Sequence, residues 1–168
     1  MKKAFTYIFC LLVILTGCAG YHAKKADVHN KLGIEYVVKK DYDKAIDEFN
    51  EAIKLNNRKL EFYYNLGVTY TEKDPISKES EDAYLKAIEY APEATEGERS
   101  QFLLYTHYNL ACIYALRGDK DNAFDHLEKA IALGGNQVYH LMQRDTDMDS
   151  LKDSQRFKEL FERIKERK

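Results

Sequence analysis

The sequence predicts an all-α fold, an α-solenoid of three helix-turn-helix repeats that ends in a C-terminal capping helix. Large apolar residues recur three and four positions apart in successive segments, which gives each expected helix one apolar face. One pattern also occurs three times: Leu, then Gly or Ala, then two further residues and Tyr. A helical hairpin of this size cannot bury its apolar face alone, so we expect neighbouring hairpins to stack.

The three copies continue in the same way, with small and bulky residues at matching places in a second helix. The first copy has Leu32, Gly33 and Tyr36, followed by Ala45, Phe49 and Ala52. The second has Leu66, Gly67 and Tyr70, followed after one extra residue by Ser80, Tyr84 and Ala87. The third has Leu110, Ala111 and Tyr114, followed by Ala123, Leu127 and Ala130. The small residues stand where two helices must approach each other closely.

This pattern resembles the tetratricopeptide repeat (TPR), whose unit has 34 residues. The resemblance implies repeats at residues 26–59, 60–94 and 104–137. Two signature positions depart from the usual residue. His29, Tyr63 and His107 stand where Trp is usual. Where Pro is usual, the first and third copies have Asn57 and Gly135, and the second keeps Pro92.

Turn and cap residues support the expected helix boundaries. Asp41 and Asp119 can each cap a second helix, and Gly118 can end the helix before it. Asp74 followed by Pro75 predicts a cap and a first helical position in the second repeat. The segment from Thr95 to Glu98 has the spacing of a capping box, so the third repeat's first helix is expected to extend over residues 96–103.

Residues 138–168 predict a C-terminal cap. An aspartate-rich segment from Asp145 to Asp149 precedes a stretch with Phe157, Leu160, Phe161 and Ile164 at helical spacing. We expect this last helix to cover the apolar face of the third repeat. The segment resembles the closing segment of many bacterial repeat proteins.

Residues 1–17 predict a secretory signal peptide. Lys2 and Lys3 precede an apolar run over residues 4–15, which at helical rise spans roughly 18 Å and is too short for a stable membrane span. The run ends in Leu15-Thr16-Gly17-Cys18, which resembles the lipobox of bacterial lipoproteins. That resemblance implies that Cys18 is acylated and becomes the mature N-terminus, that residues 18–25 form a lipidated tether, and that the protein is held at a membrane of the bacterial cell envelope. In a Gram-negative host, Ala19 favours the outer membrane, facing the periplasm.

Charge and cysteine usage exclude several classes. Cleavage before Cys18 would remove Lys2 and Lys3 and no acid, which leaves 24 basic and 28 acidic residues and a formal charge of −4. Nothing in this balance indicates nucleic acid. With Cys10 in the leader and Cys18 acylated, only Cys112 remains, so no disulfide is expected, and its place on an apolar helix face predicts a small buried hydrophobe.

We expect no enzyme, no cofactor and no metal site. The sequence contains no phosphate-binding Gly-x-x-x-x-Gly-Lys, no His-Glu-x-x-His and no Gly-x-Ser-x-Gly. Asp145, Asp147 and Asp149 resemble the start of an EF-hand loop. However, Ser150 stands at the position that needs glycine, and Arg156 stands where a bidentate Glu should close the shell. The five histidines show no ligand spacing, and His29 and His107 are expected to pack between helices.

The resemblance to TPR proteins implies a concave groove lined by the first helix of each repeat. The positions that point into it are then Asn30, Ile34, Val38, Tyr64, Val68, Tyr105, Tyr108 and Cys112. Tyrosines give large, stiff contact area with a polar tip, which suits a bound peptide or helix. The cationic carboxylate clamp of chaperone-binding relatives is absent, because Asn30, Ile34, Tyr105 and Asn109 occupy its positions. The alternative for the tyrosines is that they simply fill helix packing.

Two functions follow as hypotheses. The first is a membrane-anchored scaffold or adaptor that binds a protein or peptide in the groove. The alternative is a structural subunit that self-associates into an envelope assembly without a client peptide. The sequence leaves the partner, the pathway and the oligomeric state open.

Overall fold

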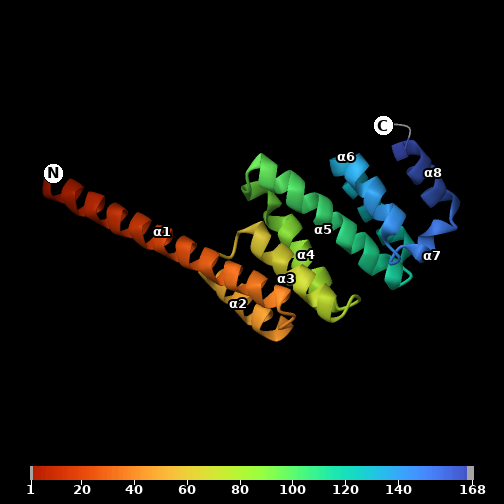
Figure 1. The fold of residues 1–168 in the computed structure, drawn as a ribbon. Coiled ribbons are helices and arrows are strands. Elements are labelled where there is room, and N and C mark those ends of the chain that lie inside the picture. The colour runs from red at the N-terminus through yellow and green to blue at the C-terminus, as the bar shows by residue number, and fades with distance from the viewer. Residues whose placement is uncertain (1, 166–168) are drawn as a thin grey trace. The chain divides into compact units, whose positions relative to one another are not determined.

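Every regular element of the computed structural model is a helix over residues 2–165, the part of the chain that the structure describes; side chains are described from residue 20 to residue 165 (Figure 1). The chain divides into two compact units, Met1–Arg58 and Lys59–Lys168, and each is taken by itself below. The helical content and the hairpin arrangement confirm the all-α, TPR-like fold class.

The first unit is one helical hairpin formed by α1 (Lys2–Val38) and α2 (Tyr42–Leu55). The two helices approach closely at Gly33, where a Cβ atom would lie 2.6 Å from the Cε1 atom of the Phe49 ring. Asp41 caps α2 by accepting a hydrogen bond from the backbone N–H of Lys44, as the sequence predicts. Ala45 and Phe49 are fully buried in this hairpin.

The expected leader, from residue 2 onward, and the expected tether both fall within α1. The backbone is helical without interruption from Lys2 into the first repeat, so residues 18–25 continue the repeat's first helix. The side chain of Cys18 lies outside the described residues. Within the residues whose side chains are described, no helix is long and apolar enough to span a membrane.

The second unit starts with the hairpin of α3 (Leu60–Lys73) and α4 (Lys78–Tyr90), followed by a short 3₁₀ helix, η1 (Ala91–Glu93). Gly67 repeats the close approach of the first hairpin, because its Cβ would lie 2.7 Å from the ring of Tyr84. The expected start of α4 at Asp74-Pro75 is wrong. The helix begins at Lys78, where Ser77 is the N-cap and its hydroxyl accepts from the N–H of Ser80 at 3.1 Å. Asp74 instead ends α3 and accepts from the N–H of Ile76 within the turn.

The third hairpin pairs α5 (Glu96–Leu116) with α6 (Lys120–Arg144). Thr95 and Glu98 form the predicted capping box, so α5 begins at Glu96 and includes the expected extension over residues 96–103. Gly118 ends α5 with a φ of +79°, and Asp119 caps α6. Gly134 has non-helical dihedral angles, so α6 is kinked there before it continues to Arg144.

The C-terminal segment covers the third hairpin. It consists of a turn at residues 145–148, then α7 (Asp149–Lys152) and α8 (Gln155–Lys165). Phe157, Leu160 and Ile164 of α8 are buried in the same apolar core as Leu127 and Met142 of α6. The predicted amphipathic capping helix is therefore present and packs on the third repeat (Figure 1).

Candidate functional site

The expected groove positions of the second unit lie on α3 and α5, and they differ in how far they are exposed. Those on α5 are Tyr105, Tyr108 and Cys112, each about one helical turn after the last. Those on α3 are Tyr64 and Val68. The structure leaves part of this set accessible and closes the rest with the chain's own C-terminal segment.

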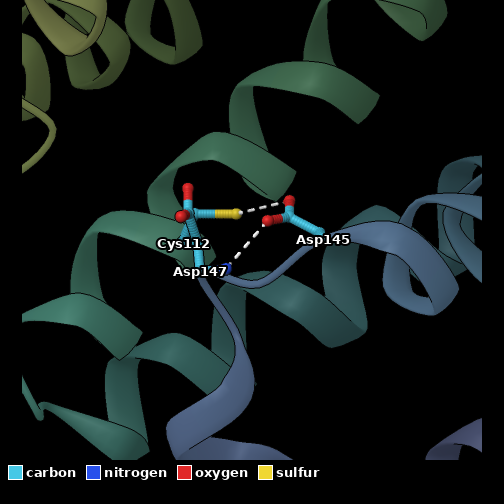
Figure 2. A group of neighbouring side chains, drawn as sticks. All are labelled: Cys112, Asp145 and Asp147. Carbon is cyan, nitrogen blue, oxygen red and sulfur yellow. Dashed lines mark hydrogen bonds between the residues drawn. The ribbon is translucent and has the colours of Figure 1, made fainter.

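Tyr108 and Cys112 are closed off. They are 3% and 7% exposed. The phenol of Tyr108 donates to Oδ2 of Asp145 at 2.9 Å. Figure 2 shows the Cys112 thiol pointing to the same carboxylate, with the sulfur 3.5 Å from Oδ2. Ser150 adds a hydrogen bond from its hydroxyl to the carbonyl of Ala115. The expectation that Tyr108 and Cys112 line an open groove therefore does not hold in this structure, because residues 145–151 pack over them.

Burial and the adjacent carboxylates set the ionisation of these two groups. The pKa of the Cys112 thiol is raised, first by desolvation and then by the charges of Asp145 and Asp147. The pKa of Tyr108 is also raised, again mainly by burial. Both groups are therefore neutral hydrogen-bond donors at physiological pH, and a neutral buried thiol is a poor nucleophile. The prediction that Cys112 is a small buried side chain is confirmed.

Tyr64 and Val68 on α3 are half-buried. The ring of Tyr64 meets Phe102 of α5 edge-on, with the ring centroids 5.1 Å apart, and lies 6.1 Å from the ring of Tyr84. The pKa of Tyr64 is raised, first by burial and then by the charge of Tyr105. Val68 packs against the small core of Tyr84, Leu110 and Ile113. Part of this aromatic set thus does fill helix packing.

Tyr105 lies at the edge of an open cleft. The cleft has a volume of about 390 Å³ and lies between α5 and the last two turns of α6. Its lining residues are Tyr105, Gln137, His140, Leu141, Arg144 and Asp145. Arg144 is exposed and forms no ion pair or hydrogen bond with the described residues. The cleft therefore combines an aromatic wall, an aliphatic side chain and an available cation.

The three groove positions of the first unit are divided between surface and interior. Asn30 is buried, with 4% of its surface exposed, so it does not line an open groove. Ile34 and Val38 are 41% and 79% exposed on α1. They stand four residues apart on a helix and therefore share one face.

The histidines at the Trp position pack between the two helices of their hairpins. His107 is buried, and its Nδ1 lies 3.0 Å from Nδ1 of His126 on α6. His29 pairs in the same way with Glu48, at 2.7 Å. Each pair is separated by 19 residues, so the two contacts occupy equivalent places in their repeats. The repeat register places His126 opposite His107, as it places Glu48 opposite His29.

A larger polar network ties the second hairpin to the third. The guanidinium of Arg117 donates to a carboxylate oxygen of Glu81 and to the carbonyls of Ile76 and Ser77. The phenol of Tyr114 donates to the other oxygen of Glu81 at 2.8 Å. These bonds hold α4 against α5 and so fix the spacing of the concave positions of the two repeats.

Comparison with known proteins agrees with this geometry. A TPR repeat model matches residues 33–74, and a tetratricopeptide repeat model matches residues 104–133. BBSome complex member BBS4 from Bos taurus is 35% identical over 109 residues, which is 65% of this chain and 19% of that protein. TPR repeat-containing protein MJ1428 from Methanocaldococcus jannaschii is 35% identical over 106 residues, which is 62% of this chain and 17% of that protein.

The chain thus spans less than a fifth of the length of each of these relatives. The tetratricopeptide repeat is a protein-interaction module. The first match includes Gly33 and Gly67, and the second covers part of α5 and of α6, whereas α4 lies outside both. The chain therefore carries tetratricopeptide repeats, folded as all-α helical hairpins.

Proposed function

We propose that this protein is a membrane-anchored scaffold that binds a protein partner of the bacterial cell envelope. The observation that carries the proposal is the open cleft beside Tyr105. Tyr108 is covered by the chain itself, whereas Tyr105 remains partly exposed at the cleft. Aromatic side chains beside a pocket with one available cation are typical of protein-binding surfaces.

Tyr105 and Arg144 are the residues that we assign to partner contact. Tyr105 offers apolar area with a polar tip, and Leu141 supplies the aliphatic floor of the same cleft. Arg144 can pair with a carboxylate of the partner without first breaking a bond to any of the described residues. The relative from Bos taurus is named as a member of a protein complex, and membership of a complex is consistent with this assignment.

The anchor part of the proposal depends on the leader sequence. Leu15-Thr16-Gly17-Cys18 supplies the apolar residue, the two small residues and the thiol that lipoprotein processing requires. Acylation of Cys18 would place the repeats at a membrane surface, in the outer membrane of a host with two membranes. Stable anchoring needs more than one acyl chain, which diacylation of Cys18 would provide.

Site-specific photocrosslinking tests the partner surface. A photoreactive residue is placed at Tyr105 in one variant and at Leu85, an exposed position on α4, in another. We expect the Tyr105 variant to form a discrete adduct with a second protein in intact cells, and the Leu85 variant to form none. Adducts of equal yield from both positions would contradict the assignment.

Self-association is the second candidate function. Exposed large apolar residues on α1 favour it, namely Tyr21, Val28, Ile34 and Val38. A helix with such residues can pair with a second copy of itself. Light scattering after size-exclusion chromatography decides between the two, because a monomer at every concentration excludes self-assembly. A crosslinked adduct at twice the mass of the chain would support self-association instead.

A further inference from the structure

Three metal-ligand side chains meet where the C-terminal turn packs on α5. Cys112 comes from α5, and Asp145 and Asp147 come from the turn after α6 (Figure 2). The Cys112 sulfur and one carboxylate oxygen of each aspartate all lie within 4.8 Å of one another. The thiol is buried and both aspartates are half-buried, which separates this cluster from the exposed acidic groups that are common on protein surfaces.

The spacing of the sulfur and oxygen atoms fits tetrahedral zinc. With a Zn–S bond of about 2.3 Å and a Zn–O bond of about 2.0 Å, a tetrahedral angle separates sulfur from oxygen by roughly 3.5 Å. The distance between Cys112 Sγ and Asp145 Oδ2 is 3.5 Å. A cation could thus take the place of the thiol proton with little movement of either side chain.

The orientation of Asp145 is fixed by its neighbours. Its Oδ2 accepts from the phenol of Tyr108 at 2.9 Å, and its Oδ1 accepts from the backbone N–H of Asp147 at 2.9 Å. Ligands in metal sites are commonly held by such outer hydrogen bonds, which set the direction of the donor atom. The turn therefore presents its carboxylates to the thiol in a defined arrangement.

The cluster also carries negative charge at Asp147 that no cation among residues 20–165 offsets. The Asp147 carboxylate forms no hydrogen bond or ion pair with the described residues. Asp145 and Asp149 stand two residues before and after it, and ionised carboxylates close together repel one another. Lys152, the nearby cation, bonds the carbonyl of Asp145 and the carboxylate of Asp149. A divalent cation between the carboxylates and the thiol would remove this repulsion.

We propose that Cys112, Asp145 and Asp147 bind one thiophilic divalent cation of the Zn²⁺ class, with water completing the coordination. The thiol proton leaves to solvent when the metal–sulfur bond forms, and no electron is transferred. A thiolate ligand favours Zn²⁺ over Ca²⁺ and Mg²⁺, which prefer oxygen alone. The metal would fasten the C-terminal turn to α5, so it acts as a staple between the third repeat and its cap. The EF-hand-like spacing of the aspartates does not predict this group of three ligands, because Cys112 stands 33 residues before Asp145.

Titration of the purified full chain with Cd²⁺ and Zn²⁺ tests the site. The protein carries Cys10→Ser and Cys18→Ser, so Cys112 is the only thiol, and it is first stripped with a chelator. We expect one Cd²⁺ per chain, with the ultraviolet charge-transfer band of a cadmium–thiolate bond, and competition by Zn²⁺. Zn²⁺ should also raise the thermal midpoint of unfolding.

Two ligand variants and one control variant show whether the metal binds at the proposed residues. Cys112→Ala should abolish the charge-transfer band, and Asp147→Asn should weaken binding by about tenfold or more, since even the loss of an outer-shell partner costs about 10- to 100-fold. Asp149→Asn, which alters an exposed carboxylate of the same turn, should bind as the parent does. Far-ultraviolet circular dichroism verifies that each variant is folded. Absence of the band in the parent protein, binding of Ca²⁺ with no thiolate signal, or equal Cd²⁺ affinity in the parent and Asp147→Asn would each overturn the proposal.

Discussion

The phenol of Tyr108 donates a hydrogen bond to Asp145 across 37 positions of the sequence, with a distance of 2.9 Å between the two oxygens. This bond joins the first helix of the third repeat to the turn that starts the C-terminal cap. The resemblance to TPR proteins assigns Tyr108 to the groove, whereas this contact makes it a buried packing residue. The proposed partner surface is therefore centred on Tyr105, which stays partly exposed beside the cleft.

Replacing Tyr108 with Phe should destabilise the protein by about 1 to 3 kcal/mol, because a buried hydrogen bond to a charged group is lost. Urea unfolding followed by circular dichroism measures this change. Tyr105→Phe is the matched control, since the Tyr105 hydroxyl forms no hydrogen bond with the described residues, and it should change stability by less than about 0.5 kcal/mol. Equal losses in the two variants would show that the Tyr108 contact does not hold the cap.

Gly67→Ala should also destabilise the protein. The new Cβ would lie 2.7 Å from the buried ring of Tyr84, which cannot move without disturbing the core of Leu110 and Ile113. Overpacking of this kind costs about 1 to 3 kcal/mol. Gly97→Ala serves as the control, because nothing lies within 4 Å of its Cβ position. That change should be neutral or stabilising by up to about 1 kcal/mol, and a stable Gly67→Ala protein would contradict the helix register.

Lowering the pH through the range in which His107 takes up a proton should reduce the free energy of unfolding. Burial and the neighbouring His126 lower the pKa of His107 from 6.5 to about 4, so the folded state resists protonation. The unfolded chain binds this proton as the pH drops below about 6.5, and the folded chain does so only near pH 4. His107 therefore does not change the free energy of unfolding above pH 6.5. It lowers that free energy by about 2 to 3 kcal/mol as the pH falls to 4.

Unfolding free energies measured between pH 7 and pH 4 check this slope. His107→Gln should flatten it, whereas His140→Gln, which alters an exposed histidine, should leave it unchanged. A pH profile that is the same in the parent and in His107→Gln would mean that other groups set the acid sensitivity.

Cys18→Ala should abolish lipid attachment. The parent chain is expected to incorporate labelled palmitate in a bacterial host with lipoprotein processing, because the thiol of Cys18 is the acceptor in the lipobox-like sequence. Cys10→Ala removes a thiol from the expected leader and should keep the label. Incorporation of the label by Cys18→Ala would refute the lipoprotein hypothesis.

Local sequence signals predicted the hairpins well, because the information lies within a few residues. The caps at Asp41 and Asp119 and the capping box at Thr95 are confirmed, since each depends on a side chain and an N–H three residues away. The helix start at Asp74-Pro75 was misplaced because Ser77, three residues after Asp74, caps α4 instead.

Local signals could not predict whether the expected groove positions are exposed or covered. Burial of Tyr108 and Cys112 depends on how residues 145–151 fold back, and nothing local to α5 specifies that contact. The pairing of His107 with His126 was available from the repeat register, because His29 and Glu48 stand at the same two positions of the first repeat.

The central claim is that the partner binds in the cleft beside Tyr105. The most direct test titrates this protein with the purified, uncrosslinked partner that the photocrosslinking identifies. The dissociation constant is measured for the parent, for Tyr105→Ala and for Leu85→Ala. Truncation of a central aromatic contact costs about 2 kcal/mol or more, so Tyr105→Ala should bind about 30-fold more weakly, and Leu85→Ala should bind as the parent does. Unchanged affinity of Tyr105→Ala would contradict the account.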